Sequence, residues 1–184
     1  MRKFRGFIAI KIKATPKILE FEKKIIDIDA DVKLVEPQNI HITLKFLGDV
    51  EENLVEDIER NIRDAVNEIN PFSIELNGAG FFPNQNYIKV IWIGIKNSEP
   101  IKKISENIDG KLVNLGFKKE KRGFSPHLTI GRVKTAKNKQ LLQEVIEKYD
   151  DAEFSVEKIE SIKLMKSVLN SKGPIYSVIK DIEL

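Results

Sequence analysis

Short runs in which apolar and polar residues alternate are separated along this chain by stretches with apolar residues at helical spacing. The alternation over residues 4–13 ("FRGFIAIKIK") predicts a strand, because successive side chains on a strand point to opposite faces. Residues 15–28 begin with a Thr–Pro pair and then place apolar residues three or four positions apart, which predicts a capped helix. Strand and helix patterns of this kind continue to the end of the chain.

Further strands are predicted over 39–48, 71–83, 86–96, 127–133, 153–168 and 174–184, and further helices over 49–70, 98–117 and 138–150. Gly48 is expected to end its strand and Gly116 its helix. Glu51 and Glu52 suit the first turn of a helix, where the helix dipole favours acidic side chains. We therefore interpret this acidic pair as the start of the second helix and not as catalytic groups.

The predicted elements occur twice in the same order. "GFIAIKI" resembles "VIWIGIK", "HITL" resembles "HLTI" and "PFSIEL" resembles "EFSVEK", with offsets of 84, 86 and 82 residues. Self-similarity near one fixed period is the signature of an internal repeat. We therefore predict one α+β domain over 1–184 made of two pseudo-symmetric lobes, with repeats at roughly 5–80 and 87–165 and a closing strand over 174–183.

Both histidines of the chain occur in the same short pattern, a histidine followed two residues later by a threonine. His41 precedes Thr43, and His127 precedes Thr129. Residues i and i+2 of a strand share a face, so each histidine lies on the same face as its threonine. If the two repeats pair about a pseudo-twofold axis, two imidazoles and two hydroxyls line one site.

Two imidazoles and two hydroxyls suit in-line displacement at phosphorus. An imidazole with an ordinary pKa of about 6.5 can be neutral or charged near neutral pH, so one histidine can accept a proton while the other donates one. Threonine hydroxyls can hold the non-bridging phosphate oxygens. Two histidines 86 positions apart in a chain without cysteine are a poor metal-ligand set, so we expect no metal and no cofactor.

"HITLKFLG" and "HLTIGR" resemble the paired signatures of the two-histidine (2H) phosphoesterase superfamily, in its LigT-like branch. That branch comprises RNA 2′,3′-cyclic phosphodiesterases, first named 2′-5′ RNA ligases, and the likeness covers nearly the whole chain. The resemblance implies two antiparallel sheets flanked by helices, with a central cleft between two lobes. It also implies hydrolysis of RNA 2′,3′-cyclic phosphate ends to 2′-phosphomonoesters, with RNA ends, tRNA fragments or nucleotides as substrates.

The resemblance also implies a role for each residue of the two motifs. His41 would be the proton donor and His127 the proton acceptor, while Thr43 and Thr129 would bind phosphate oxygens. The residues themselves are symmetric and leave the assignment of donor and acceptor open.

Two cationic residues near the motifs are further candidates for phosphate binding. Arg132 matches an arginine that assists phosphate binding in related enzymes, although strict alternation puts it on the face opposite His127. A bulge or strand end near Gly131 would remove that conflict. Lys45 shares the face of His41 by the same alternation, so it is a candidate for phosphate contact or simply a solvated lysine.

A basic loop and several aromatic residues offer weaker signals for RNA recognition. Residues 118–123 ("KKEKRG") could steer an RNA backbone toward the second motif, or form an ordinary solvated loop. A terminal base could stack on an aromatic ring, and such rings are also commonly part of the core. Trp92 lies in an alternating apolar strand and is expected in the core. The base-stacking candidates are Phe124, Phe81, Phe82 and Tyr87.

The composition narrows the setting without identifying a function. The net charge of +3 is compatible with an anionic substrate but is too small to identify a nucleic-acid-binding protein. No stretch approaches the roughly 18 apolar residues of a membrane helix, so we expect no membrane association and a cytoplasmic location. We also expect a monomer.

Two alternative functions use the same residues. A nucleotide-independent 2′-5′ RNA ligase would need the same histidines, and the sequence cannot separate it from the hydrolase. A non-catalytic module that binds RNA ends or nucleotides would need the cleft but no proton transfer.

Overall fold

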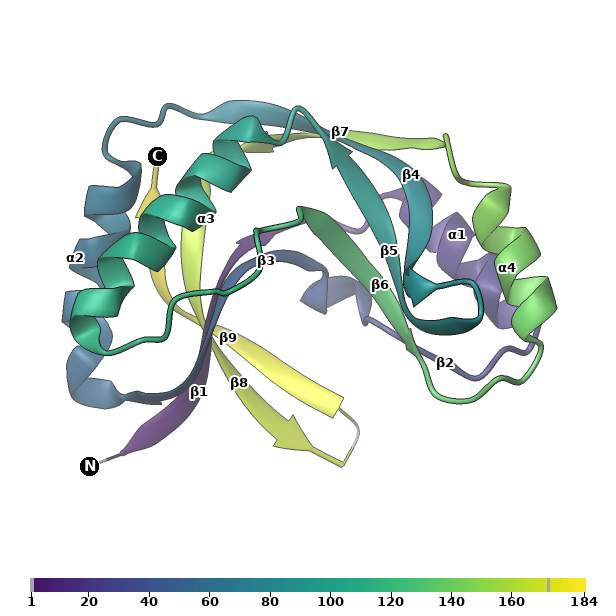
Figure 1. The fold of residues 1–184 in the computed structure, drawn as a ribbon, viewed down its shortest axis with the longest axis horizontal. Coiled ribbons are helices and arrows are strands. Elements are labelled where there is room, and N and C mark those ends of the chain that lie inside the picture. The colour runs from purple at the N-terminus through teal and green to yellow at the C-terminus, as the bar shows by residue number, and fades with distance from the viewer. Residues whose placement is uncertain (1, 172) are drawn as a thin grey trace.

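The fold has two antiparallel sheets and four α-helices, seen here in a computed structural model that describes residues 2–171 and 173–184 (Figure 1). The first sheet has the strand order β3-β1-β8-β9, and the second has the order β2-β6-β5-β4-β7. The predicted α+β class is therefore confirmed. The strands are β1 (Lys3–Lys11), β2 (Val32–Leu34), β3 (His41–Glu51), β4 (Phe72–Asn84), β5 (Tyr87–Lys96), β6 (His127–Val133), β7 (Glu153–Ile159), β8 (Ser161–Asn170) and β9 (Gly173–Glu183).

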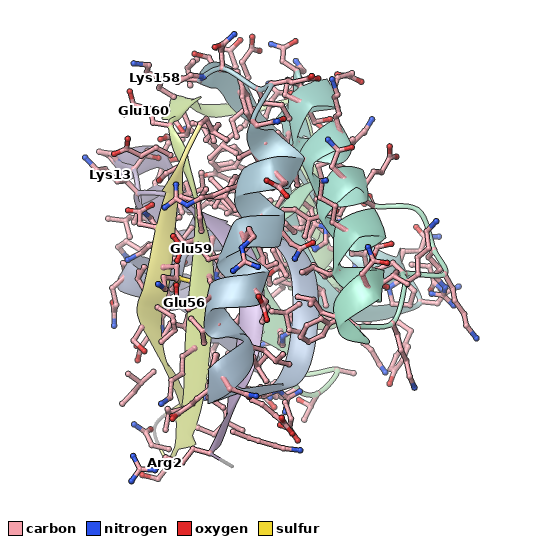
Figure 2. All side chains as sticks on the ribbon, turned by 90° about the vertical axis from the view of Figure 1, so that its left-hand side faces the viewer. Arg2, Lys13, Glu56, Glu59, Lys158 and Glu160 are labelled. Carbon is pink, nitrogen blue, oxygen red and sulfur yellow. The ribbon has the colours of Figure 1, made fainter. Side chains whose placement is uncertain are left out.

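Each sheet carries two helices on its outer side, on opposite sides of the molecule in Figure 1. The helices α2 (Val55–Val66) and α3 (Glu99–Leu112) pack on the first sheet, where α2 contacts β9 and α3 contacts β3. The helices α1 (Pro16–Asp27) and α4 (Lys139–Glu147) pack on the second sheet, where they contact β7 and β4. Figure 2 shows Glu56 and Glu59 on α2, and both pair with Lys180 of β9 at 2.7 Å.

The two sheets mix strands from both halves of the chain. β8 and β9 come from the end of the chain and extend the first sheet, while β2 and β4 belong to the second sheet. β4 pairs with β7, with Phe72 opposite Ile159, so "PFSIEL" and "EFSVEK" are neighbours in one sheet and not counterparts in two lobes. Consecutive halves of the chain therefore do not form separate lobes. The internal duplication over 5–80 and 87–165 stays a prediction.

The first helix shows how the sequence pattern produces local structure. Thr15 caps α1 by accepting a hydrogen bond from the Ile18 backbone N–H at 3.4 Å, and Pro16 occupies the first turn. Ile18, Phe21 and Ile25 lie on one face of α1 and are buried. Burying each such side chain contributes about 1.5–3 kcal/mol of hydrophobic stabilisation. The predicted helix over 15–28 is confirmed, apart from its end residues.

The predicted helix over 49–70 begins too early. β3 continues through Gly48 to Glu51, and α2 starts only at Val55. Gly48 adopts a φ of +69°, which glycine tolerates without strain, and it pairs with Gly6 at a register shift. This local irregularity lets the strand continue where a stop was expected. Glu51 pairs with Lys3 across the sheet, and Glu52 opens a short 3₁₀ turn, so the acidic pair precedes α2.

Gly116 ends its helical segment as expected. α3 is followed by a 3₁₀ turn over Val113–Leu115, and Gly116 then has a left-handed φ of +87°. Within the described ranges, no helix combines the length and the apolar character needed to cross a membrane.

Candidate active site

His41 and His127 occupy equivalent positions, each as the first residue of its strand. His41 Nδ1 lies 2.6 Å from the carbonyl oxygen of Asn39, and His127 Nδ1 lies 2.8 Å from that of Ser125. A carbonyl oxygen can only accept, so each Nδ1 carries a proton and each Nε2 is left to exchange protons. β3 and β6 contact each other although they belong to different sheets. The fold thus brings the two H-x-T strands together with both histidines in the same tautomer.

The environment of His41 is aromatic and partly closed. Its ring centroid lies 5.1 Å from that of Phe7 on β1 and 5.4 Å from that of Tyr176 on β9. His41 Nε2 lies 3.0 Å from Thr43 Oγ1, which confirms that the two side chains share a face. Because Nδ1 already donates, Nε2 of the neutral ring accepts a hydrogen bond from the Thr43 hydroxyl.

Burial and a nearby cation set the protonation of His41. Burial lowers the pKa of His41 from its ordinary value of 6.5, and the positive charge of Arg132 lowers it further. The hydrogen bond to the Asn39 carbonyl opposes both effects. In the free protein the neutral form of His41 is therefore favoured near neutral pH.

His127 lies beside a different aromatic pair. Its ring meets Phe82 edge-on, with centroids 5.2 Å apart and an interplanar angle of 87°. Phe82 in turn contacts Trp92 at 5.2 Å. Trp92 is opposite Thr129 in the ladder between β5 and β6, so it lies on the face of the histidine and is only partly buried. The expectation that Trp92 belongs to the core is therefore wrong.

The other aromatic candidates lie further from this geometry. Phe124 and Phe81 pack against the hydrophobic core, while Tyr87 is exposed and has the Lys89 ammonium over its ring. Of the four aromatic candidates, Phe82 is the one with a described ring contact to a motif histidine. Base stacking by Phe124 stays a prediction.

A bulge in β6 turns Arg132 to the face of His127. The register passes from Ile91 opposite Gly131 to Trp92 opposite Thr129, which leaves Ile130 as an extra residue. One extra residue reverses the alternation beyond it. This is the irregularity expected near Gly131. The positive charge of Arg132 helps to lower the pKa of His41 and opposes the burial that raises the pKa of Tyr176. Arg132 belongs to the second sheet, so its charge acts across the site on two residues of the first sheet.

The corresponding irregularity in β3 turns Lys45 away from His41. Thr43 pairs with Ala9 and Lys45 with Ile8, so Leu44 is the extra residue. Lys45 is 3% exposed and forms an ion pair with Asp109 of α3. The expectation that Lys45 shares the face of His41 is wrong, because strict alternation does not survive the bulge. Lys45 is not retained as a phosphate ligand.

Lys45 and Asp109 instead anchor the basic loop that precedes the second motif. Lys45 Nζ donates to the Lys118 carbonyl at 2.8 Å, and the Asp109 carboxylate accepts from the Glu120 backbone N–H at 3.2 Å. A strand of the first motif therefore holds the loop leading to the second. No local pattern predicts this partnership, since the two charges are 64 positions apart.

The described residues contain no group of three or more His, Asp or Glu side chains placed to hold a metal ion. Metal independence stays a prediction.

An α+β fold in which two H-x-T strands meet, each starting with a histidine anchored through Nδ1, defines a two-histidine phosphoesterase-like protein. A family model, that of the 2′-5′ RNA ligase superfamily, matches residues 14–166, and the chain belongs to this superfamily. The predicted resemblance to the family is thus confirmed.

Individual relatives extend the likeness over most of the chain. An RNA 2′,3′-cyclic phosphodiesterase of Methanocaldococcus jannaschii is 51% identical over 150 residues, covering 82% of this chain and 83% of the relative. Another of that name, from Methanothermobacter thermautotrophicus, is 38% identical over 177 residues, covering 95% and 96%. A crystal structure from Thermus thermophilus shares the fold with a TM-score of 0.82 at 24% identity, covering 98% and 97%.

Proposed function

We propose that this protein is an RNA 2′,3′-cyclic phosphodiesterase that opens cyclic phosphate ends to 2′-phosphomonoesters without a metal ion. The observation that carries the proposal is the matched pair of histidines, each anchored through Nδ1 to a carbonyl and free to exchange protons at Nε2. The names of the two archaeal relatives support the same reaction. The substrates would be RNA fragments that end in a cyclic phosphate.

Hydrolysis requires one proton acceptor and one proton donor on opposite sides of the phosphorus. His127 Nε2 accepts a proton from water as the water oxygen bonds to phosphorus. The bond between phosphorus and O3′ breaks, and its electron pair stays on O3′. His41 Nε2 donates the proton that O3′ needs, which yields a 3′-hydroxyl and a 2′-phosphate.

Polar groups near the histidines would stabilise the charge that develops on phosphorus. Thr43 shares the face of His41, and Thr129 lies on the corresponding position of β6. The Arg132 side chain is exposed on the His127 face and close enough to influence His41. A guanidinium and two hydroxyls aimed at the phosphate would favour the dianionic transition state over the monoanionic substrate.

The donor role of His41 depends on the bound substrate. Burial and Arg132 hold the pKa of His41 below its usual value in the free protein, which disfavours the charged form. An anionic phosphodiester placed between His41 and Arg132 offsets the cation and stabilises the imidazolium. Substrate binding would therefore supply the proton donor where it is needed.

The decisive experiment is incubation of a short RNA ending in a 2′,3′-cyclic phosphate with the protein and EDTA, followed by identification of the product. We expect a 2′-phosphate from the wild-type protein and from the control Lys158→Ser, whose side chain pairs with Glu160 and lies on β7, an edge strand of the second sheet. His41→Ala and His127→Ala should lose at least about 10²-fold in rate.

The outcomes separate the alternatives. A 3′-phosphate product would mean that the other ester bond breaks and that the assigned geometry is wrong. Loss of activity in EDTA, restored by a divalent metal, would contradict the metal-free mechanism. No product from folded wild-type protein would contradict the proposed reaction and favour a non-catalytic RNA-end binding module.

A further inference from the structure

A basic cavity opens at the end of β3 that lies away from His41. Its volume is about 810 Å³, and it lies between the end of β3 and residues 115–122, which follow α3. The loop that forms one wall is held by Lys45 and Asp109, as described above. The cavity is therefore built on an anchored wall.

One of the residues that line this cavity is an exposed phenylalanine. Phe46 is 65% exposed, although it lies in the middle of a strand whose other large apolar residues are buried. It occupies the position five residues after His41, just as Arg132 follows His127 by five. Because of the β3 bulge, Phe46 points to the His41 face, while Lys45 is buried.

A row of aromatic rings connects His41 to Phe46. The Phe7 ring contacts His41 at 5.1 Å and lies 6.5 Å from Phe46. Phe7 is buried and Phe46 is exposed, so Phe46 is the ring of this pair that can receive a further group. Tyr176 closes the other side of His41 at 5.4 Å.

The charges around the cavity suit a polyanion. Among the described residues, five cationic and three acidic side chains line it. Lys3 forms an ion pair with Glu51 at 3.5 Å. The other cations Lys119, Lys121 and Arg122 are exposed, and in the described part of the chain none of them takes part in an ion pair or side-chain hydrogen bond. Unpaired cations beside an exposed aromatic ring are the features that proteins use to hold single-stranded nucleic acid.

We propose that this cavity binds the single-stranded RNA segment immediately upstream of the cyclic phosphate end, with a base stacked on Phe46 and phosphates beside Lys119, Lys121 and Arg122. The proposal rests on the function proposed above, because the terminal nucleotide must sit at the histidines for the upstream segment to reach Phe46. The enzyme would then prefer oligonucleotides to cyclic mononucleotides, since only an oligonucleotide spans both places.

The test compares two substrates with the same terminal nucleotide, a 2′,3′-cyclic mononucleotide and a single-stranded hexanucleotide ending in a 2′,3′-cyclic phosphate. We expect wild-type protein to favour the hexanucleotide in kcat/KM, and Phe46→Ala to reduce that preference about tenfold. A triple variant, Lys119→Ser with Lys121→Ser and Arg122→Ser, should reduce both the preference and its dependence on salt. Val156→Ala, an exposed apolar residue of β7, and Lys158→Ser on the same strand are the apolar and cationic controls.

The controls lie away from the cavity. In Figure 2, Lys158 is at the opposite end of the molecule from Arg2, which precedes the cavity residue Lys3. An unchanged preference in Phe46→Ala, or an equal loss on both substrates, would overturn the proposal. An equal preference for a blunt double-stranded end would overturn the single-stranded assignment.

A binding measurement keeps this test separate from the proposed reaction. Fluorescence anisotropy with a labelled hexanucleotide ending in a 2′-phosphate needs no turnover. If the wild-type protein turns over neither substrate, weaker binding by Phe46→Ala than by Val156→Ala still supports the cavity as an RNA site. Equal binding by the two variants overturns it.

Discussion

Lys45 of β3 and Asp109 of α3 form a buried ion pair that also holds the backbone of the loop over residues 118–123. The Lys45 side chain is 2% exposed and that of Asp109 is 12% exposed. A buried charge that loses its partner is strongly destabilising, because its desolvation is no longer offset. The pair therefore links the stability of the first sheet to the position of the loop before His127.

We expect Lys45→Met to lower the free energy of unfolding by about 3–5 kcal/mol, because it leaves the Asp109 carboxylate buried without its cation. The double variant Lys45→Met with Asp109→Leu should recover much of that loss, since it removes both charges. Denaturant unfolding measures both effects. A double variant as unstable as the sum of the two single variants would show that the charges act independently.

Arg132 should set the pH dependence of the reaction through His41. Burial and the charge of Arg132 both lower the pKa of His41, so Arg132→Gln should raise that pKa. If His41 takes part in proton transfer, the limb of the kcat/KM profile that reports its pKa should move to higher pH in the variant. NMR titration of the His41 ring measures the pKa directly.

The same variant tests whether His41 takes part in proton transfer. If the pKa of His41 rises in Arg132→Gln but neither limb of the kcat/KM profile moves, the proposed acid–base role of His41 is wrong. Lys89→Gln is a suitable control, because Lys89 lies over Tyr87 and not among the groups that act on the pKa of His41. An unchanged His41 pKa in Arg132→Gln would contradict the electrostatic link.

The alternation of side chains along a strand correctly predicts which residues share a face only up to the bulge in β3 and the bulge in β6. His41 and Thr43 share a face as expected, because no irregularity separates them. One extra residue at Leu44 then reverses Lys45, and one at Ile130 reverses Arg132. A bulge depends on the partner strand, which a local pattern does not contain. Strict alternation therefore predicts the wrong face for both residues, and only the bulge expected near Gly131 corrects that of Arg132.

Local sequence patterns also do not predict which distant segments pair as neighbouring strands. The three residues of β2 are too few to show a period, and they become a strand only by pairing with β6. The contact of Tyr176 with His41 joins residues 135 positions apart in sequence and arises because β9 completes the first sheet. Helices with strong caps, such as α1, needed no such information.

Glu22 should make the protein less stable as the pH rises. It lies on α1, is 6% exposed and has a carboxylate oxygen without a described partner. Burial raises its pKa from 4.5 to about 7. A folded-state pKa above the unfolded value favours folding while the group is protonated, and this stability is lost between pH 4.5 and about 7.

Glu22→Gln removes this titration without a large change in shape. Its melting temperature should therefore fall less than that of the wild-type protein between pH 5 and pH 8. Glu144→Gln, on the exposed side of α4, is the control for a carboxylate on a helix. Parallel melting curves for wild-type protein and Glu22→Gln across this range would contradict the assignment.

Two glycines should respond to alanine in opposite directions because their surroundings differ. A Cβ at Gly80 would lie 2.3 Å from the Trp92 ring, whereas nothing lies within 4 Å of a Cβ at Gly110 in α3. Gly80→Ala should displace Trp92 from its place beside Phe82 and lower the free energy of unfolding by about 1–3 kcal/mol. Gly110→Ala should raise it by about 1 kcal/mol, since alanine favours the helix.

The displacement of Trp92 also reaches the candidate site, because Phe82 contacts both Trp92 and His127. Gly80→Ala should therefore change the intrinsic tryptophan fluorescence, which reports the chain's single Trp, and reduce kcat on the cyclic phosphate substrate. Gly110→Ala should change neither. An unchanged fluorescence spectrum in a destabilised Gly80→Ala protein would contradict the displacement of Trp92. It would mean that the backbone of β4 moves and the Trp92 ring does not, so that Phe82 and His127 keep their contact.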